Sequence, residues 1–294
     1  MKTNNISRNL KKKSILVSAM ALLFLGSCTE RIDIDLEESY TRLVVEGIVT
    51  TDTLAHTIRL STTTSYYYAE QAPPVRGAAV SFDDGISVTP LTETEPGIYQ
   101  TSPDYHGIPG RTYTLNISLA SAINGHETYT AVSQMNPKLT LDSINSTYHD
   151  DWGPDGYYEI RCYVLDPPTT DFYMFRVFKN GILISDSLNK VLVTDDRFYN
   201  GNYTNGVGIG FLNQSFEKEI VTPGDILTIE SARITEEYYR FISQLQIQTG
   251  YQNPLFSGPP ANISGNISNG GIGFFATYPV SYSKTIASGI KSGR

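Results

Sequence analysis

The sequence predicts a mainly β protein, and three observations lead to this fold class. From Leu43 onward, short runs of alternating or β-branched residues are separated by turn residues at intervals of roughly ten positions. Such spacing is typical of β-sandwiches and differs from that of chains in which strands alternate with helices. One segment, at about residues 234–249, instead carries apolar residues at helical spacing. We therefore expect two β domains, the second with one amphipathic helix.

The first domain is expected at residues 39–136, as an immunoglobulin-like or transthyretin-like sandwich. Its strand-like runs are LVVEGIVT, HTIRLSTTT, VRGAAVSFDDG, GIYQTS, GRTYTLNIS and ETYTAVSQM. Glycine-containing turns close successive strands, as hairpins require. The boundary rests mainly on Asn136-Pro137, a turn-forming pair.

The second domain is expected at residues 137–294. Its runs are LTLDSINSTY, YYEIRCYVLD, FYMFRVFKNGILIS, NKVLVTDD, VGIGFLNQ and DILTIESA. The clearest hairpin joins residues 172–178 to 182–184, because Asn180-Gly181 supplies the positive φ angles of a two-residue turn. In YYEIRCYVLD, alternation puts Cys162 on an apolar face with Ile160 and predicts a small buried side chain.

The expected helix at about 234–249 is amphipathic. Its apolar positions are Ile234, Tyr238, Phe241, Ile242 and Leu245. Glu236 and Glu237 favour the positive end of a helix dipole, and Gly250 is placed to end the helix. We interpret the segment as a helix that packs on a sheet.

The first 27 residues are predicted to be a lipoprotein signal peptide. Residues 1–13 contain five basic residues and no acid, and the apolar stretch at 15–25 is too short to cross a bilayer core of roughly 30 Å. Leu25-Gly26-Ser27-Cys28 resembles a bacterial lipobox, in which the cysteine is acylated. Cys28 is therefore predicted to hold the protein on the membrane through its lipid; the alternative is a plain signal peptide with a chance cysteine.

Residues 28–38 form a predicted acidic tether, and the whole mature chain is acidic. Loss of residues 1–27 removes five basic residues and no acidic ones, which changes the formal net charge from −8 to −13. Such a charge repels nucleic acid, so we expect no nucleic-acid partner. The tether resembles a signal for export to the outer face of the outer membrane, and an ordinary solvated linker is the alternative.

Motifs for metal, cofactor or catalysis are absent from the sequence. The four histidines, His56, His106, His126 and His149, are isolated, and HDDWGPDGYYE does not fit a calcium loop. No G-x-S-x-G or phosphate-binding loop occurs. We therefore predict no metal site, no cofactor and no catalytic residue. Convergence of acidic residues in space, into a metal site or a glycan-directed hydrolase, stays open.

Aromatic residues supply the candidate contact sites. The chain has 20 tyrosines, whose rings combine an apolar body with a hydrogen-bonding tip. Tyr66, Tyr67 and Tyr68 are consecutive, and Trp152 lies in a loop rich in glycine and proline close to Tyr157. We interpret these five residues as candidate partner or ligand contacts. The alternative is that they decorate a sheet or belong to a core.

The order of several motifs resembles one protein family. The lipobox, LVVEGIVT, VRGAAVSFDDG, GIYQTS, GRTYTLNIS, LTLDSI and NPLFSGPPANISGNISNGGIGFF are similar to those of Bacteroidetes-type outer-membrane lipoproteins with a domain of unknown function. These lipoproteins are typically encoded beside a TonB-dependent receptor. The resemblance spans nearly the whole mature chain and implies no catalytic residues.

The resemblance also implies a function. It points to a non-enzymatic, lipid-anchored protein of the outer membrane, facing the cell surface, which acts as an accessory or ligand-binding partner of a TonB-dependent transporter. Its ligand is left undefined. The main alternative is a structural or adhesive cell-surface protein, and a glycan-directed hydrolase is a weaker one.

Overall fold

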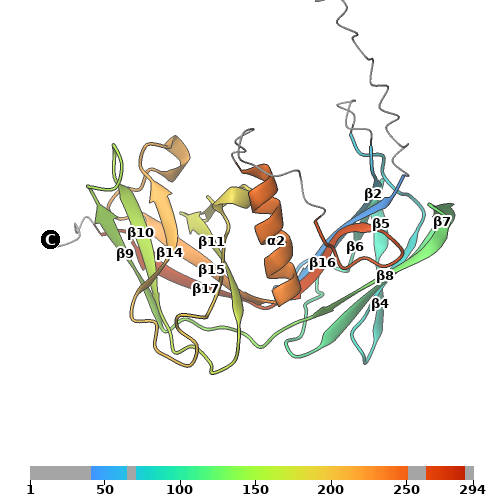
Figure 1. The fold of residues 1–294 in the computed structure, drawn as a ribbon, viewed down its shortest axis with the longest axis horizontal. Helices are drawn as coiled ribbons and strands as arrows, with labels where there is room; N and C mark the ends of the chain where they lie inside the picture. The colour runs from blue at the N-terminus through green and yellow to red at the C-terminus, as the bar shows by residue number, and fades with distance from the viewer. Residues whose placement is uncertain (1–40, 65–70, 251–262, 289–294) are drawn as a thin grey trace, which may run out of the picture. The chain divides into compact units, whose positions relative to one another are not determined.

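The computed structural model describes residues 41–64, 71–250 and 263–288, which belong to one compact unit (Figure 1). These residues form several β-sheets and one α-helix, so the predicted mainly β class is confirmed. Cys28, the acidic tether at 28–38 and Tyr66, Tyr67 and Tyr68 lie outside the described residues.

Two sheets form a first sandwich. One sheet has the order β16-β1-β2-β6-β5 and the other the order β4-β3-β7-β8. Their strands are β1 (Leu43–Thr50), β2 (Thr57–Thr62), β3 (Ala79–Asp83), β4 (Val88–Pro90), β5 (Thr92–Glu95), β6 (Ile98–Gln100), β7 (Thr112–Ile123), β8 (His126–Gln134) and β16 (Ile272–Tyr278). Alternating side chains from both sheets meet in one core, where Phe82 stacks on Phe275 with ring centroids 5.4 Å apart.

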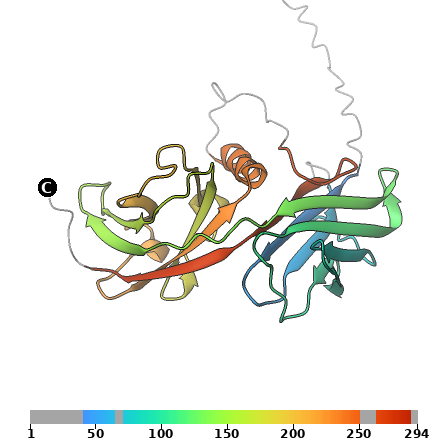
Figure 2. The same cartoon turned by 90° about the horizontal axis from the view of Figure 1, so that it is seen from below.

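Strand β16 differs from the predicted division at residue 136. It lies in the sequence range 137–294, yet it pairs in parallel with β1 at the edge of the first sheet, from Val44 and Ile272 to Thr50 and Tyr278. After Pro279 the chain continues as β17 (Val280–Ile286), which pairs with a strand of the second sandwich (Figure 2). The two sandwiches therefore share one stretch of chain, a feature that local sequence patterns do not contain.

The second sandwich packs a three-stranded sheet on a larger one. The first has the order β14-β10-β9, and the second the order β12-β11-β15-β17, with β13 also paired to β11. Their strands are β9 (Ser143–His149), β10 (Tyr157–Tyr163), β11 (Phe172–Lys179), β12 (Ile182–Leu183), β13 (Leu192–Asp195), β14 (Val207–Asn213) and β15 (Ile226–Ile234), and the 3-10 helices η1 (Leu188–Lys190) and η2 (Glu217–Glu219) lie in loops.

Strand β10 confirms the predicted burial of Cys162. Its thiol lies in the core with Ile160, and burial raises the pKa of this thiol to about 11. The opposite face differs from a simple alternation, because Glu159 is also buried, at 7% exposure. The predicted hairpin is present as well: Asn180 and Gly181 have φ angles of 51° and 83° between β11 and β12.

Helix α2 (Glu236–Thr249) agrees with the helix predicted near residues 234–249. Thr235 caps its start by accepting a hydrogen bond from the Tyr238 amide, and its buried face includes Ile242. Ile242 packs in a third apolar cluster with Phe274 of β16, so β11 and β15 are covered on both faces. No helix among the described residues combines the length and the apolar character needed to span a membrane.

Candidate functional site

Trp152 lies in the loop between β9 and β10, on the outer side of the three-stranded sheet. Its ring stacks on that of His149, with centroids 3.8 Å apart and planes 8° from parallel. The ring of Phe211, on β14, is 6.3 Å from Trp152. His149 is buried, whereas Trp152 and Phe211 keep 37% and 47% of their surfaces exposed. Stacking on His149 thus fixes the orientation of the indole ring and leaves part of its surface exposed to solvent.

Charged side chains form a hydrogen-bonded group with the ring of His149. Nε2 of His149 lies 2.8 Å from Oε2 of Glu159, and Nε of Arg161 donates to the same oxygen at 2.8 Å. The hydrogen bond that Arg161 donates to the Glu159 carboxylate raises the pKa of the guanidinium. We call Trp152, His149, Glu159, Arg161 and Phe211 together the Trp152 platform.

Two glycines lie where a larger residue would clash with side chains in and beside the platform. A Cβ atom at Gly208 would lie 2.6 Å from Oε1 of Glu159 and 2.8 Å from Cζ of Phe211. Gly153 has a φ of +75°, and a Cβ there would lie 3.3 Å from the ring of Tyr157. Because Gly153 follows Trp152 directly, this turn brings the half-buried Tyr157 beside the same loop. Trp152 and Tyr157, both predicted as contacts, therefore lie in one region of the surface.

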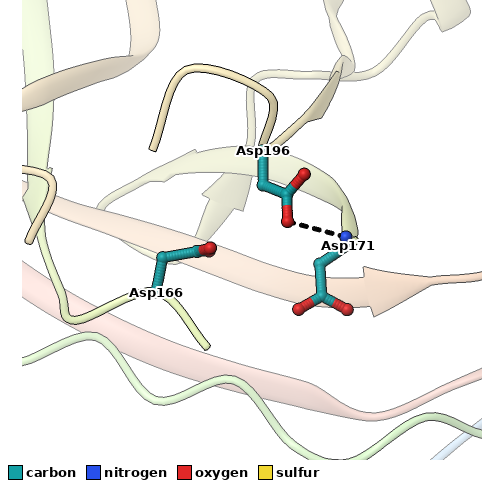
Figure 3. Close-up of side chains that lie close together, drawn as sticks. All are labelled: Asp166, Asp171 and Asp196. Atoms are coloured by element: carbon teal, nitrogen blue, oxygen red, sulfur yellow. Dashed lines mark hydrogen bonds between the residues drawn. The ribbon is translucent and has the colours of Figure 1, made fainter. Parts of the chain in front are cut away.

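A second group of side chains gathers where β11 begins. Asp166, Asp171 and Asp196 each offer a carboxylate oxygen, and the three atoms lie within 4.8 Å of one another. Figure 3 shows the Asp166 carboxylate directed toward the other two side chains. All three residues are buried, at 2–3% exposure. We call these three residues the aspartate cluster.

Backbone pairing places the cluster. Asp171 directly precedes β11, and Asp196 directly follows β13, which is the neighbour of β11. The Asp171 amide donates to Oδ2 of Asp196 at 2.8 Å, and the Asp196 amide donates to the Asp171 carbonyl at 3.2 Å. Asp166 comes from the β10–β11 connection, where its amide donates to the carbonyl of Asn202 at 3.0 Å. Two loops are thereby fastened together around the carboxylates.

Two further side chains reach the cluster from neighbouring strands. The Tyr173 hydroxyl donates to Oδ1 of Asp166 at 2.5 Å, and Nε of Arg233 donates to Oδ1 of Asp171 at 2.5 Å. Burial, followed by the neighbouring carboxylates Asp166 and Asp171, raises the pKa of Asp196. Asp171 and Arg233 also line a cavity of about 520 Å³ whose other walls include β8 and the start of α2.

Sequence reasoning found part of these sites. Trp152 and Tyr157 were recognisable as aromatics in a turn-rich loop, but His149, Glu159 and Phe211 come from three strands and carry no shared motif. The aspartate cluster spans thirty positions of sequence, without metal-ligand spacing. Its local signal is limited to Asp171 and Asp196, which directly flank β11 and β13, whereas Asp166 follows the end of β10 by three residues.

Comparison with known proteins identifies the family. The family model described as "Domain of unknown function (DUF4249)" matches residues 29–284. Among curated proteins, the comparison found no match to the chain. The family match covers most of the sequence and begins directly after Cys28. The chain therefore belongs to the DUF4249 family.

Proposed function

We propose that this chain is a non-enzymatic outer-membrane lipoprotein, anchored through Cys28, that binds a TonB-dependent receptor as an accessory or ligand-binding partner. The Trp152 platform is the observation that carries the binding role. Tryptophan and arginine are enriched among residues that dominate interface energies, and both side chains are partly exposed here. A ring that is already held by stacking loses little side-chain entropy when a partner covers it.

The composition of the platform supports this contact role. Its apolar rings lie over a buried ionic group, so a partner can gain apolar contact from Trp152 and Phe211 and hydrogen bonds from Arg161. The aspartate cluster does not support the alternative of a glycan-directed hydrolase, because its carboxylates are 2–3% exposed and a sugar cannot reach them.

The lipobox and the family resemblance support the location and the partner. The predicted anchor is tested by Cys28→Ala, which we expect to abolish labelling with palmitate and to release the protein from the outer-membrane fraction. Continued labelling and membrane fractionation of this variant would contradict the anchor.

The partner is tested by affinity purification of the tagged, lipidated protein from detergent-solubilised outer membrane. We expect a TonB-dependent receptor to co-purify, and Trp152→Ala to lower its recovery by roughly tenfold or more. The matched control is Phe198→Ala, which removes an aromatic ring that is 82% exposed and lies outside the platform. The melting temperatures of both variants should stay close to that of the wild type.

Three results would count against the proposal in different ways. Equal loss of receptor from both variants would remove the specific role of the platform. Unfolding of Trp152→Ala would assign the indole to the core. Recovery of no receptor by the correctly lipidated wild type would contradict the transport role and favour a structural or adhesive surface protein.

A further inference from the structure

The aspartate cluster carries more negative charge than its surroundings compensate. Asp166, Asp171 and Asp196 supply three carboxylates, and Arg233 is paired with one of them, Asp171. Tyr173 contributes a neutral hydroxyl. Removing carboxylates from water is costly unless each is paired with a cation or fully hydrogen-bonded. With all three ionised, two negative charges remain uncompensated, which matches the charge of one divalent cation.

One oxygen of the cluster has no partner at all. Oδ2 of Asp166 and Oγ of Ser146 are the two buried side-chain oxygens without a hydrogen bond in the described part of the chain. Asp166 is 98% buried, and its carboxylate is directed toward Asp171 and Asp196 (Figure 3). As an ionised carboxylate oxygen it accepts no hydrogen bond, and a cation between the carboxylates would satisfy it.

The donor set selects the kind of cation. The cluster offers carboxylate oxygens and no histidine or cysteine, which favours a hard ion over zinc or copper. Two ligands of one Ca²⁺ at 2.3–2.6 Å can lie at most about 5 Å apart, and the three oxygens lie within 4.8 Å. Mg²⁺ requires shorter bonds and near-octahedral geometry, which a set drawn from two irregular loops suits less well.

We propose that Asp166, Asp171 and Asp196 form a calcium site that fastens the β10–β11 connection to the loop that follows β13. Oδ2 of Asp166 supplies a ligand that is otherwise unpaired, and Asp171 and Asp196 supply the others. Arg233 neutralises the remaining charge on Asp171. The 520 Å³ cavity lined by Asp171 and Arg233 borders the cluster and gives the ion a route from solvent. This site does not depend on the proposed receptor.

The test uses the full mature chain, treated with EDTA and then dialysed free of chelator. Isothermal titration with CaCl₂ is expected to show one site per chain, and Ca²⁺ should raise the melting temperature more than an equal concentration of Mg²⁺. Asp166→Asn keeps the side-chain size but removes a charged ligand, so we expect it to weaken binding by about tenfold or more. The matched control, Asp104→Asn, changes an exposed carboxylate in the first sandwich and should leave Ca²⁺ binding unchanged.

Several outcomes overturn the proposal. The first is a folded, EDTA-treated wild type that binds no Ca²⁺. The second is full Ca²⁺ binding by a folded Asp166→Asn variant, because the ion would then lie elsewhere. If Asp166→Asn does not fold, Asp196→Asn is tested under the same criterion. If neither variant folds, the wild-type titration decides: one Ca²⁺ bound per chain upholds the site, and no binding overturns it.

Discussion

The two sandwiches bury different kinds of side chain. In the described residues of the first sequence region, 41–136, His56 is the one buried ionisable residue besides tyrosine. The second region buries six carboxylates and a histidine. These residues are His149, Glu159, Asp166, Asp171, Asp196, Glu219 and Glu230. The first sandwich is therefore held mainly by apolar packing, and the second also depends on matched charges.

Tyrosines account for the difference in part. Tyr99, Tyr113 and Tyr129 are among the largest fully buried side chains of the first sandwich, and their hydroxyls bond to backbone groups. The Tyr113 hydroxyl, for example, accepts from the Ile108 amide at 2.7 Å. A tyrosine core satisfies its polar atoms without any charge. The high tyrosine content is thus explained in part by the interior, whereas the sequence pointed to binding surfaces.

The largest expected effect comes from the apolar side of this comparison. Phe275→Ala removes a fully buried ring that stacks on Phe82, and we expect it to lower the free energy of unfolding by about 4 kcal/mol. Urea denaturation followed by circular dichroism measures the change. Ile86→Ala, at a position 76% exposed, is the control and should cost less than about 0.5 kcal/mol. Equal effects of the two substitutions would contradict the placement of β16 in the first core.

A slightly smaller effect is expected from a buried ion pair in the second sandwich. Arg176 holds Glu230, which is 2% exposed, through hydrogen bonds to both carboxylate oxygens at 2.5–2.7 Å. Arg176→Met leaves that carboxylate with the Tyr282 hydroxyl at 3.2 Å, and we expect a loss of about 3 kcal/mol in the same assay.

The control for this ion pair is Arg240→Met. Arg240 pairs with Glu236 on the exposed face of α2, and such pairs contribute about 0.3–0.5 kcal/mol. If Arg176→Met costs no more than Arg240→Met, the second sandwich does not depend on its buried charges, and the contrast between the two regions fails.

The smallest effect is a pH dependence that originates in the first sandwich. Burial lowers the pKa of His56, whose Nε2 lies 3.2 Å from the Asp52 carbonyl and whose Nδ1 accepts from the Thr50 amide. The folded state therefore binds a proton less readily than the unfolded state does. The contribution of the neutral His56 side chain to the free energy of unfolding is therefore complete above the ordinary histidine pKa of about 6.5. This contribution is lost as the pH falls below that value.

Urea denaturation at pH 8 and at pH 5.5 measures this dependence. We expect the wild type to lose more stability at pH 5.5 than His56→Gln does, because glutamine has no proton to gain. An identical pH dependence in both proteins would contradict the assignment to His56.

Local patterns were enough to predict local structure. Alternation placed Cys162 in the core, Asn180-Gly181 gave the hairpin, and apolar spacing gave α2 to within two residues of its start. Alternation failed at Glu159 because the face opposite the core is itself covered there by His149, under the ring of Trp152. The alternation of residues within one strand does not show whether other side chains cover its second face.

Contacts between distant segments explain what the sequence did not reveal. Asp166, Asp171 and Asp196 come together because β13 pairs with β11, and that pairing is not encoded in spacing along the chain. The same holds for β16, because nothing in its own sequence indicates that it pairs in parallel with β1. The strand contains one glycine, Gly273: at a φ of +96°, a Cβ atom there would lie 2.0 Å from the Val45 carbonyl oxygen. The glycine is needed for the parallel approach to β1.

The parallel pairing of β1 with β16 sets an order on folding. Arg42 contacts the Gly270 carbonyl across 228 positions of sequence, and contacts of such high order form slowly because a long loop must close first. During synthesis from the N-terminus, nearly all residues of the chain must leave the ribosome before β16 can pair with β1 at the edge of the first sandwich. Until then β1 keeps an unpaired hydrogen-bonding edge, the kind of surface that drives aggregation of nascent chains. Chains cut short before residue 272 would carry that edge permanently.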